Sequence, residues 1–124
     1  MSKFQEIMAT TGRVGVAIKG KKVFYDWINR VDPEGITVVD EPGNFYLLPH
    51  KLEMEEDIKK YLKKNFKFFF ECELFDWYTD ESLWPKRLTY KMFNEWFNII
   101  ICDVIHDTTL EYEAYDSNYG LDDI

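Results

Sequence analysis

The segment from about Leu52 to Tyr78 constrains the fold of this chain more than any other. Its first turn is acidic, which suits the positive end of a helix dipole. Lysines then follow in Glu-before-Lys i,i+4 register, such as Glu55 with Lys59. We therefore predict one long helix with an apolar stripe that must pack against other elements. The stripe consists of Met54, Ile58, Tyr61, Leu62, Phe66, Phe69, Phe70, Leu74 and Trp77.

A second apolar stripe begins in the later half of the same segment. Phe68, Cys72 and Phe75 fall on the opposite side of the predicted helix. A helix that is apolar nearly all round is buried on more than one side. We therefore expect one face to pack on a sheet and the other to lie under the segment that follows.

The residues before the long helix predict strands around a shorter helix. Val14 to Ile18 alternates apolar and small residues, which indicates a strand. Phe24 to Val31 has the spacing of an amphipathic helix, and Asp32-Pro33 ends it. Ile36 to Val39 and Phe45 to Leu48 flank a segment rich in turn residues, so we expect them to pair as a β-hairpin.

The residues after the long helix predict a short helix and one or two strands. Thr89 can cap a helix that runs through Phe97. Asn98 to Thr108 is strongly β-like and apolar on both alternating faces at first, which is typical of an inner strand. Leu110 to Ala114 is a further candidate, as an edge strand.

This order of elements favours an α+β fold. We predict an antiparallel sheet of four to five strands with helices on one face, in the ferredoxin-like βαββαβ order with an extra short helix. A different α+β meander is the alternative. A chain of 124 residues fits a single domain over residues 1–124. Within it, residues 1–12 are expected to form a loose N-terminal arm and residues 115–124 an acidic tail.

Charge is divided unevenly along the chain. Of its formal net charge of −8, the first 67 residues contribute +2 and the residues from Phe68 onward −10, with thirteen acids and three bases. Such a field repels nucleic acid and anionic lipid and attracts basic partners. We therefore expect no nucleic-acid and no membrane partner, and a basic protein as the partner.

The cysteines and the N-terminus suggest a location. Cys72 and Cys102 each lie in an apolar run, where free thiols behave as small hydrophobic side chains. Met1 to Thr11 has no apolar run long enough for a secretory signal or a membrane span. We expect a cytoplasmic protein with two buried free thiols.

The pattern around the one histidine near the C-terminus does not predict a metal or nucleophilic site. On a strand, Asp103 and Asp107 share one face while His106 lies on the other. No paired-histidine or CxxC spacing occurs. Cys102 and His106 are roughly 13 Å apart along a strand, too far for a hydrogen bond. We expect no metal, no cofactor and no catalytic residue.

Carboxylates on the long helix are a further candidate for acid–base chemistry. Glu73 and Asp76, with Glu71 nearby, are spaced so that two of them can share a helix face near Trp77. Spacing alone does not raise a carboxyl pKa, because an apolar setting or a like charge is needed. We interpret this set as a solvated helix face.

Two groups of residues are candidates for binding. The first is an acidic, tyrosine-containing stretch whose charges could steer a basic partner and whose rings could supply contact area. Solubility and protection of an exposed sheet edge are the alternative explanation. This stretch includes Asp103, Asp107, Glu111, Tyr112, Glu113, Tyr115 and Asp116. The second group is an aromatic set that could line a pocket, namely Phe69, Phe70, Trp77, Trp84 and Trp96.

The run from Leu83 to Phe97 carries a Trp-Pro pair, a spaced Phe and a Trp-Phe pair, and the strand from Ile99 to Asp107 follows it. This arrangement resembles a small bacterial family of uncharacterised proteins. Leu47-Leu48-Pro49 and the segment Asp26 to Pro33 are also similar, so that the resemblance covers most of residues 14–107. It implies no activity, cofactor or catalytic residue.

Three functional hypotheses follow. The first is a small, acidic, non-enzymatic protein-binding or inhibitory module that engages a basic partner, as an immunity protein neutralises a cationic toxin. The second is a small-molecule-binding protein or enzyme with an aromatic-lined pocket. The third is a structural subunit or homodimer, since the long helix carries surplus apolar surface. For the oligomeric state we therefore expect a monomer or a homodimer.

Overall fold

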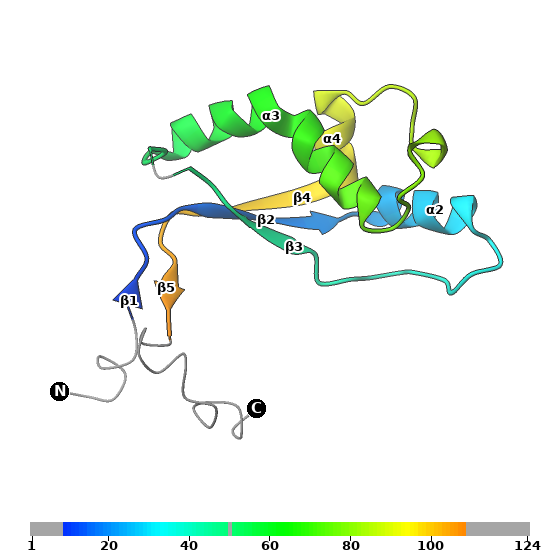
Figure 1. The fold of residues 1–124 in the computed structure, drawn as a ribbon, viewed down its shortest axis with the longest axis horizontal. Coiled ribbons are helices and arrows are strands. Elements are labelled where there is room, and N and C mark those ends of the chain that lie inside the picture. The colour runs from blue at the N-terminus through cyan, green and yellow to red at the C-terminus, as the bar shows by residue number, and fades with distance from the viewer. Residues whose placement is uncertain (1–8, 50, 109–124) are drawn as a thin grey trace, which may run out of the picture.

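The computed structural model describes residues 9–49 and 51–108, which form an α+β fold with a three-stranded antiparallel sheet and three α-helices (Figure 1). The strands of this sheet lie in the order β3-β2-β4. In chain order the elements are β1 (Ala9–Thr10), β2 (Gly15–Gly20), α2 (Lys22–Val31), β3 (Asn44–Leu47), α3 (Glu55–Phe75), the 3-10 turn η1 (Glu81–Leu83), α4 (Tyr90–Trp96), β4 (Phe97–Cys102) and β5 (His106–Asp107).

β2 is the central strand, because β3 and β4 both pair with it. Ile18 lies opposite Ile99 of β4 and Asn44 of β3. Val16 and Ile18 are fully buried. Since side chains alternate across a strand, these positions define the inner face of the sheet.

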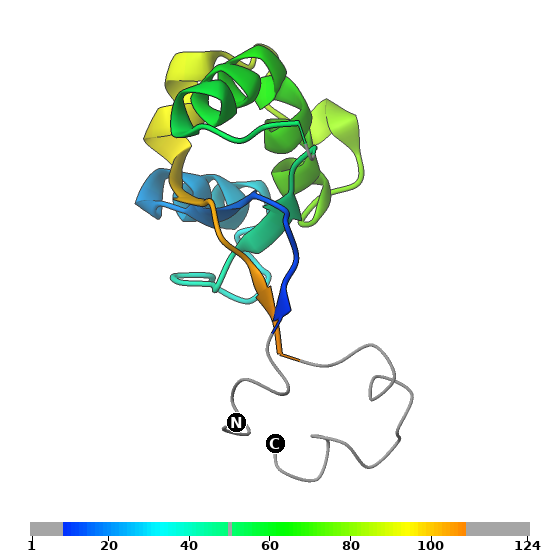
Figure 2. The ribbon, with the colours of Figure 1, turned by 90° about the vertical axis from the view of Figure 1, so that its left-hand side faces the viewer.

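The helices are arranged around the inner face and one end of the sheet. α3 and α4 lie over one face, and α2 continues past the end of β2 (Figure 1). The side view shows that β1 and β5 form a separate ladder that extends away from the sheet (Figure 2). In that ladder Ala9 pairs with Asp107, so the two ends of the described chain leave the domain side by side.

A cluster of aromatic rings joins the helices to the sheet. Phe70 of α3 is fully buried, and its ring centroid lies 5.9 Å from that of Phe93, 5.3 Å from that of Trp96 and 5.3 Å from that of Phe97. Phe24 of α2 joins the same cluster, 4.7 Å from Phe97. Ring pairs at such separations stabilise a core beyond their burial alone. The cluster therefore fixes which face of α3 points inward.

The predicted long helix is present as α3, and its direction changes at one residue. Asn65 has a non-helical backbone (φ −112°, ψ 17°), and its side-chain amide donates to the carbonyl of Tyr61 at 2.9 Å. Such a side-chain bond offers the backbone an alternative to the regular helical pattern. The kink separates a lysine-rich first half from a second half that is aromatic and acidic.

The second apolar stripe of α3 is exposed, contrary to expectation. Phe68 retains 61% and Phe75 55% of their accessible surface. The segment after α3 brings Trp84 beside this stripe but does not cover it. The prediction that this face is buried under the following segment is therefore wrong.

The predicted hairpin does not form, because Val38 is held by the Asn29 side chain of α2 and not by a neighbouring strand. The Asn29 side-chain amide donates to the Val38 carbonyl at 2.7 Å, and the Val38 N–H donates to the Asn29 side-chain oxygen at 2.8 Å. Both backbone polar groups of Val38 thus have partners without a strand. Ile36 and Val39 are exposed, and β3 pairs with β2.

The sheet also differs from the prediction at its other edge. β4 lies at the edge and is not an inner strand, since it pairs with β2 alone in the described sheet. Ile100, in the middle of its apolar run, is exposed on the outer face. The chain leaves the sheet after Cys102, and β5 pairs with β1, within the expected loose arm. The four to five strands and the ferredoxin-like order are not confirmed, and the candidate strand Leu110 to Ala114 lies outside the described residues.

The aromatic cluster makes a first prediction. Phe70→Ala should lower the free energy of unfolding by about 3–5 kcal/mol, because it removes a large side chain from a site that neighbouring rings cannot refill. Phe68→Ala, two positions away on the same helix but exposed, should change it by less than about 1 kcal/mol. Urea denaturation of the two variants measures both values. Equal losses would show that the rotation of α3 differs from the one described.

Candidate functional site

A buried carboxylate lies on the face of α3 that is turned toward β3. Glu73 is only 4% exposed and is the one charged residue among the buried side chains of the described chain. The phenol of Tyr46, on β3, donates to its Oε2 at 2.5 Å. Buried carboxylates are costly unless they are paired or hydrogen-bonded, so this residue marks a specific site.

Asn44, at the start of β3, joins this carboxylate to a second one. Its Nδ2 lies 2.8 Å from Oε2 of Glu73 and 2.6 Å from Oδ2 of Asp76. An amide nitrogen has two hydrogens, so it can donate one to each carboxylate. The group between the two negative charges is therefore a neutral amide and not a cation. Both hydrogen bonds to Glu73 fall on the same oxygen, Oε2.

The two carboxylates line a cleft of about 250 Å³ between α2, the end of α3 and the loop before β3. Aromatic side chains form much of its wall. Among the residues that the structure describes, its lining has three acids and no lysine or arginine. The lining consists of Gly20, Phe24, Tyr25, Glu41, Pro42, Gly43, Asn44, Glu73, Asp76 and Trp77.

The loop that closes the cleft is fixed to α2. The hydroxyl of Tyr25 accepts from the Glu41 N–H at 3.0 Å and lies 3.2 Å from the Glu41 carbonyl, to which it donates. Gly43 has φ +90°, and a Cβ there would lie 2.5 Å from the carbonyl oxygen of Ile18. Glycine is required at this position because of both the backbone conformation and the close approach. Glu41 and Asn44 are thus held at the cleft by a defined loop.

Burial dominates the electrostatics of the cleft. It raises the pKa of Glu73 above the ordinary value; the hydrogen bonds from Asn44 and Tyr46 oppose this effect, and the charge of Asp76 adds to it. Burial also raises the pKa of Tyr46, and the hydrogen bond to Glu73 and the negative charge of that group raise it further. Tyr46 therefore stays protonated at neutral pH and serves as a hydrogen-bond donor.

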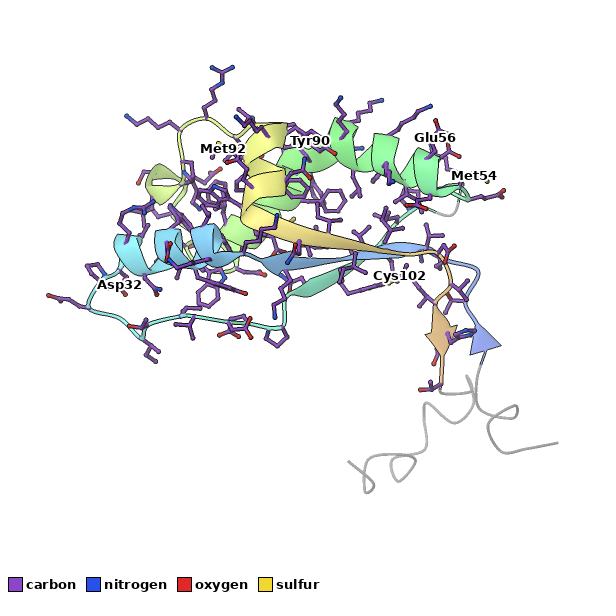
Figure 3. All side chains as sticks on the ribbon, turned by 180° about the vertical axis from the view of Figure 1, so that it is seen from behind. Asp32, Met54, Glu56, Tyr90, Met92 and Cys102 are labelled. Atoms are coloured by element: carbon purple, nitrogen blue, oxygen red, sulfur yellow. The ribbon has the colours of Figure 1, made fainter. Side chains whose placement is uncertain are left out.

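The cysteines have no activating environment in the described structure. Both are free and half-buried. Burial raises the pKa of Cys72, and the charges of Glu73, Asp76 and Glu71 raise it further. Its thiol is therefore protonated at neutral pH and a weak nucleophile. Cys102 lies at the end of β4, near the start of the β1–β5 ladder (Figure 3).

Several lysines of the first half form ion pairs with nearby acids. Lys19 lies 2.8 Å from Asp40, and Lys59 lies 3.2 Å from Glu55. No lysine or arginine of the described residues forms an ion pair with Glu73 or Asp76. Two of the acids that follow Phe68, Glu73 and Asp76, thus lie at the cleft without an ion-pair partner among the described residues.

The predicted partner-binding stretch is only partly described. Asp103 and Asp107 are exposed. Asp103 directly follows β4, and Asp107 is the last residue of β5. The others, Glu111, Tyr112, Glu113, Tyr115 and Asp116, lie outside the described residues.

The predicted aromatic-pocket residues are placed in different surroundings. Phe69, Phe70 and Trp96 are buried in the core. Trp77 lines the acidic cleft, and Trp84 lines a separate hollow on α3. Of the hollows described, none is lined by all five.

In residues 9–49 and 51–108, no group of three or more histidine, cysteine, aspartate or glutamate side chains is arranged to hold a metal ion. No helix within the same ranges is both long and apolar enough to cross a membrane.

The chain matches no family model, no curated protein and no solved structure. The site must therefore be interpreted from its own geometry.

Several cleft residues could not be identified from the sequence. The spacing of Glu73 and Asp76 correctly indicates that they lie together near Trp77. The interpretation of this set as a solvated helix face is wrong for Glu73, which is buried. Asn44 belonged to a turn in the predicted hairpin, and Tyr46 to its second strand. Only the pairing of β3 with β2 brings these two beside α3.

The buried carboxylate makes a second prediction. The native state holds the Glu73 proton to a higher pH than the unfolded chain, so the free energy of unfolding should fall as pH rises from about 4.5 through the raised pKa. Glu73→Gln keeps an oxygen that accepts hydrogen bonds but removes this titration. Urea denaturation at several pH values should therefore show a weaker fall in the variant.

Glu71→Gln, two positions away and only half-buried, is the matched control and should retain the wild-type dependence. If both variants show the same pH dependence, the burial of a titrating carboxyl at position 73 is contradicted.

Proposed function

We propose that this chain is a non-enzymatic protein-binding module whose acidic cleft receives a cationic side chain of a basic partner. The observation that supports this proposal is that the Asn44 amide joins the carboxylates of Glu73 and Asp76. Both line a cleft whose described lining has three acids and no base. A carboxylate pair held by a neutral amide lacks the cation that would balance it.

The chemistry of the cleft suits a lysine or arginine side chain. The carboxylates of Glu73 and Asp76 line the cleft, and a carboxylate has about four lone-pair sites that can accept from N–H donors. Of the rings in its lining, Phe24 and Tyr25 are buried and Trp77 is half-buried. A cation between carboxylates and aromatic rings gains both charge-assisted hydrogen bonds and cation–π attraction. The volume of about 250 Å³ fits a single such side chain.

The overall charge supports an inhibitory, immunity-like role for the module. A formal net charge of −8 would steer a cationic protein toward this surface at low salt. An inhibitor of this kind needs a binding site and no catalytic groups. In this proposal the acidic stretch after Asp103 adds to the steering, and the cleft supplies the anchor.

A second candidate is a binding protein for a small organic amine. The aromatic wall of the same cleft favours it, because rings and carboxylates also recognise free cations. The two candidates differ in whether the cation must belong to a peptide.

An NMR titration tests the proposal directly. N-acetyl-arginine methylamide, a mimic of an arginine in a chain, should shift the Trp77 indole N–H and the Asn44 side-chain amide signals. The shifts should weaken as salt rises from 50 to 500 mM, because screening reduces the attraction. N-acetyl-norleucine methylamide, which is uncharged, should produce neither shift.

Asp76→Asn should weaken the response several-fold, whereas Glu95→Gln, the same loss of charge on an exposed residue of α4, should leave it nearly unchanged. Equal shifts with the uncharged compound would contradict the proposal. Putrescine that binds more tightly than the arginine compound would favour the second candidate.

A further inference from the structure

An exposed aromatic groove lies on α3 next to the acidic cleft. Its volume is about 360 Å³. Phe68 and Phe75 form its apolar floor and retain 61% and 55% of their accessible surface. The full lining is Phe68, Glu71, Cys72, Phe75, Asp76 and Trp84.

The groove is a continuous strip and not a set of isolated apolar side chains. Phe68, Cys72 and Phe75 follow the i, i+4, i+7 spacing of one helix face, so the strip is roughly 10 Å long. Single exposed apolar residues are common, whereas a contiguous strip between polar groups is typical of a contact surface.

The wall of the groove is preformed. The indole N–H of Trp84 donates to the Tyr78 carbonyl at 2.8 Å, which holds the ring in place. The turn before it is fixed by Asp80, whose carboxylate accepts from the Ser82 N–H at 3.0 Å and from its hydroxyl at 2.7 Å. A rigid wall reduces the entropy that binding must overcome.

The charge of the groove lining indicates which kind of molecule it can bind. Glu71 and Asp76 lie in its lining. Among the described residues, those that line the groove include no lysine or arginine. A second copy would bring the same carboxylates against these, which repels. A segment of a partner with positive charge is complementary to this rim.

We infer that the groove binds a large apolar side chain of a basic partner segment, next to the lysine or arginine that enters the acidic cleft. The inference rests on the proposed function and deepens it. Asp76 lines both hollows, so one segment can occupy both with neighbouring residues. The recognised feature is then a cationic residue beside a leucine-like or aromatic residue, and not charge alone.

Two fluorescein-labelled nonapeptides test this inference. Each carries four arginines, and they differ only at two central positions, which are leucine in one and serine in the other. By fluorescence anisotropy at 50 mM salt, the wild-type protein should bind the leucine peptide about tenfold more tightly, since the groove removes an apolar side chain from water. Phe68→Ser combined with Phe75→Ser should abolish this preference and keep the affinity for the serine peptide.

Asp76→Asn should weaken binding of both peptides, and Glu95→Gln serves as the charge control. A preference that persists in the double variant overturns the inference. Equal, salt-sensitive binding of both peptides to wild type also overturns it but leaves the proposed function standing. Salt-insensitive or absent binding of both removes the proposed function as well. A wild-type dimer in sedimentation that the double variant loses would assign the groove to a second copy and overturn the inference.

Discussion

The packing of the second half of α3 against the aromatic cluster determines the rest of the functional surface. Phe70 can be fully buried only when one face of the helix points at α4 and β4. Because helix faces repeat every 3.6 residues, this rotation also fixes the other positions. It turns Glu73 toward β3 and leaves Phe68 and Phe75 in solvent. One packing constraint therefore produces both the buried carboxylate and the exposed groove.

The cleft buries the carboxyl of Glu73 beside Asp76, with no lysine or arginine in its described lining. Tyr46 and Asn44 lower the cost of burying Glu73, but neither carries a positive charge. Because burial raises the pKa of Glu73, this carboxyl lowers stability as pH rises through that pKa, relative to a side chain that does not titrate. In the proposed complex, a cation that enters the cleft would relieve this cost. Lys59 and Lys60, in the first half of α3, form ion pairs with Glu55 and Glu56 and not with the cleft.

The sequence could predict the helices and strands themselves better than it could predict which of them contact one another. The alternation in β2, the spacing in α2 and α3 and the Thr89 cap of α4 are local signals, and all correspond to elements of the structure. The hairpin was wrong because Asn29 of α2 binds the backbone of Val38, a contact that no local pattern encodes. The apolar run of β4 resembled an inner strand although Ile100 is exposed at an edge. The cleft was missed for the same reason, since Asn44 and Tyr46 meet Glu73 only through the pairing of β3 with β2.

The central claim is that Glu73 is a buried carboxylate whose charged form a bound cation would favour. The measurement that tests it most directly is the pKa of the Glu73 carboxyl, followed by its carbon-13 signal with and without saturating N-acetyl-arginine methylamide. The account predicts a pKa above the ordinary glutamate range in the free protein and a lower one in the presence of the cation, because an opposite charge stabilises the carboxylate. A pKa in the ordinary range, or one that the cation leaves unchanged, would contradict it.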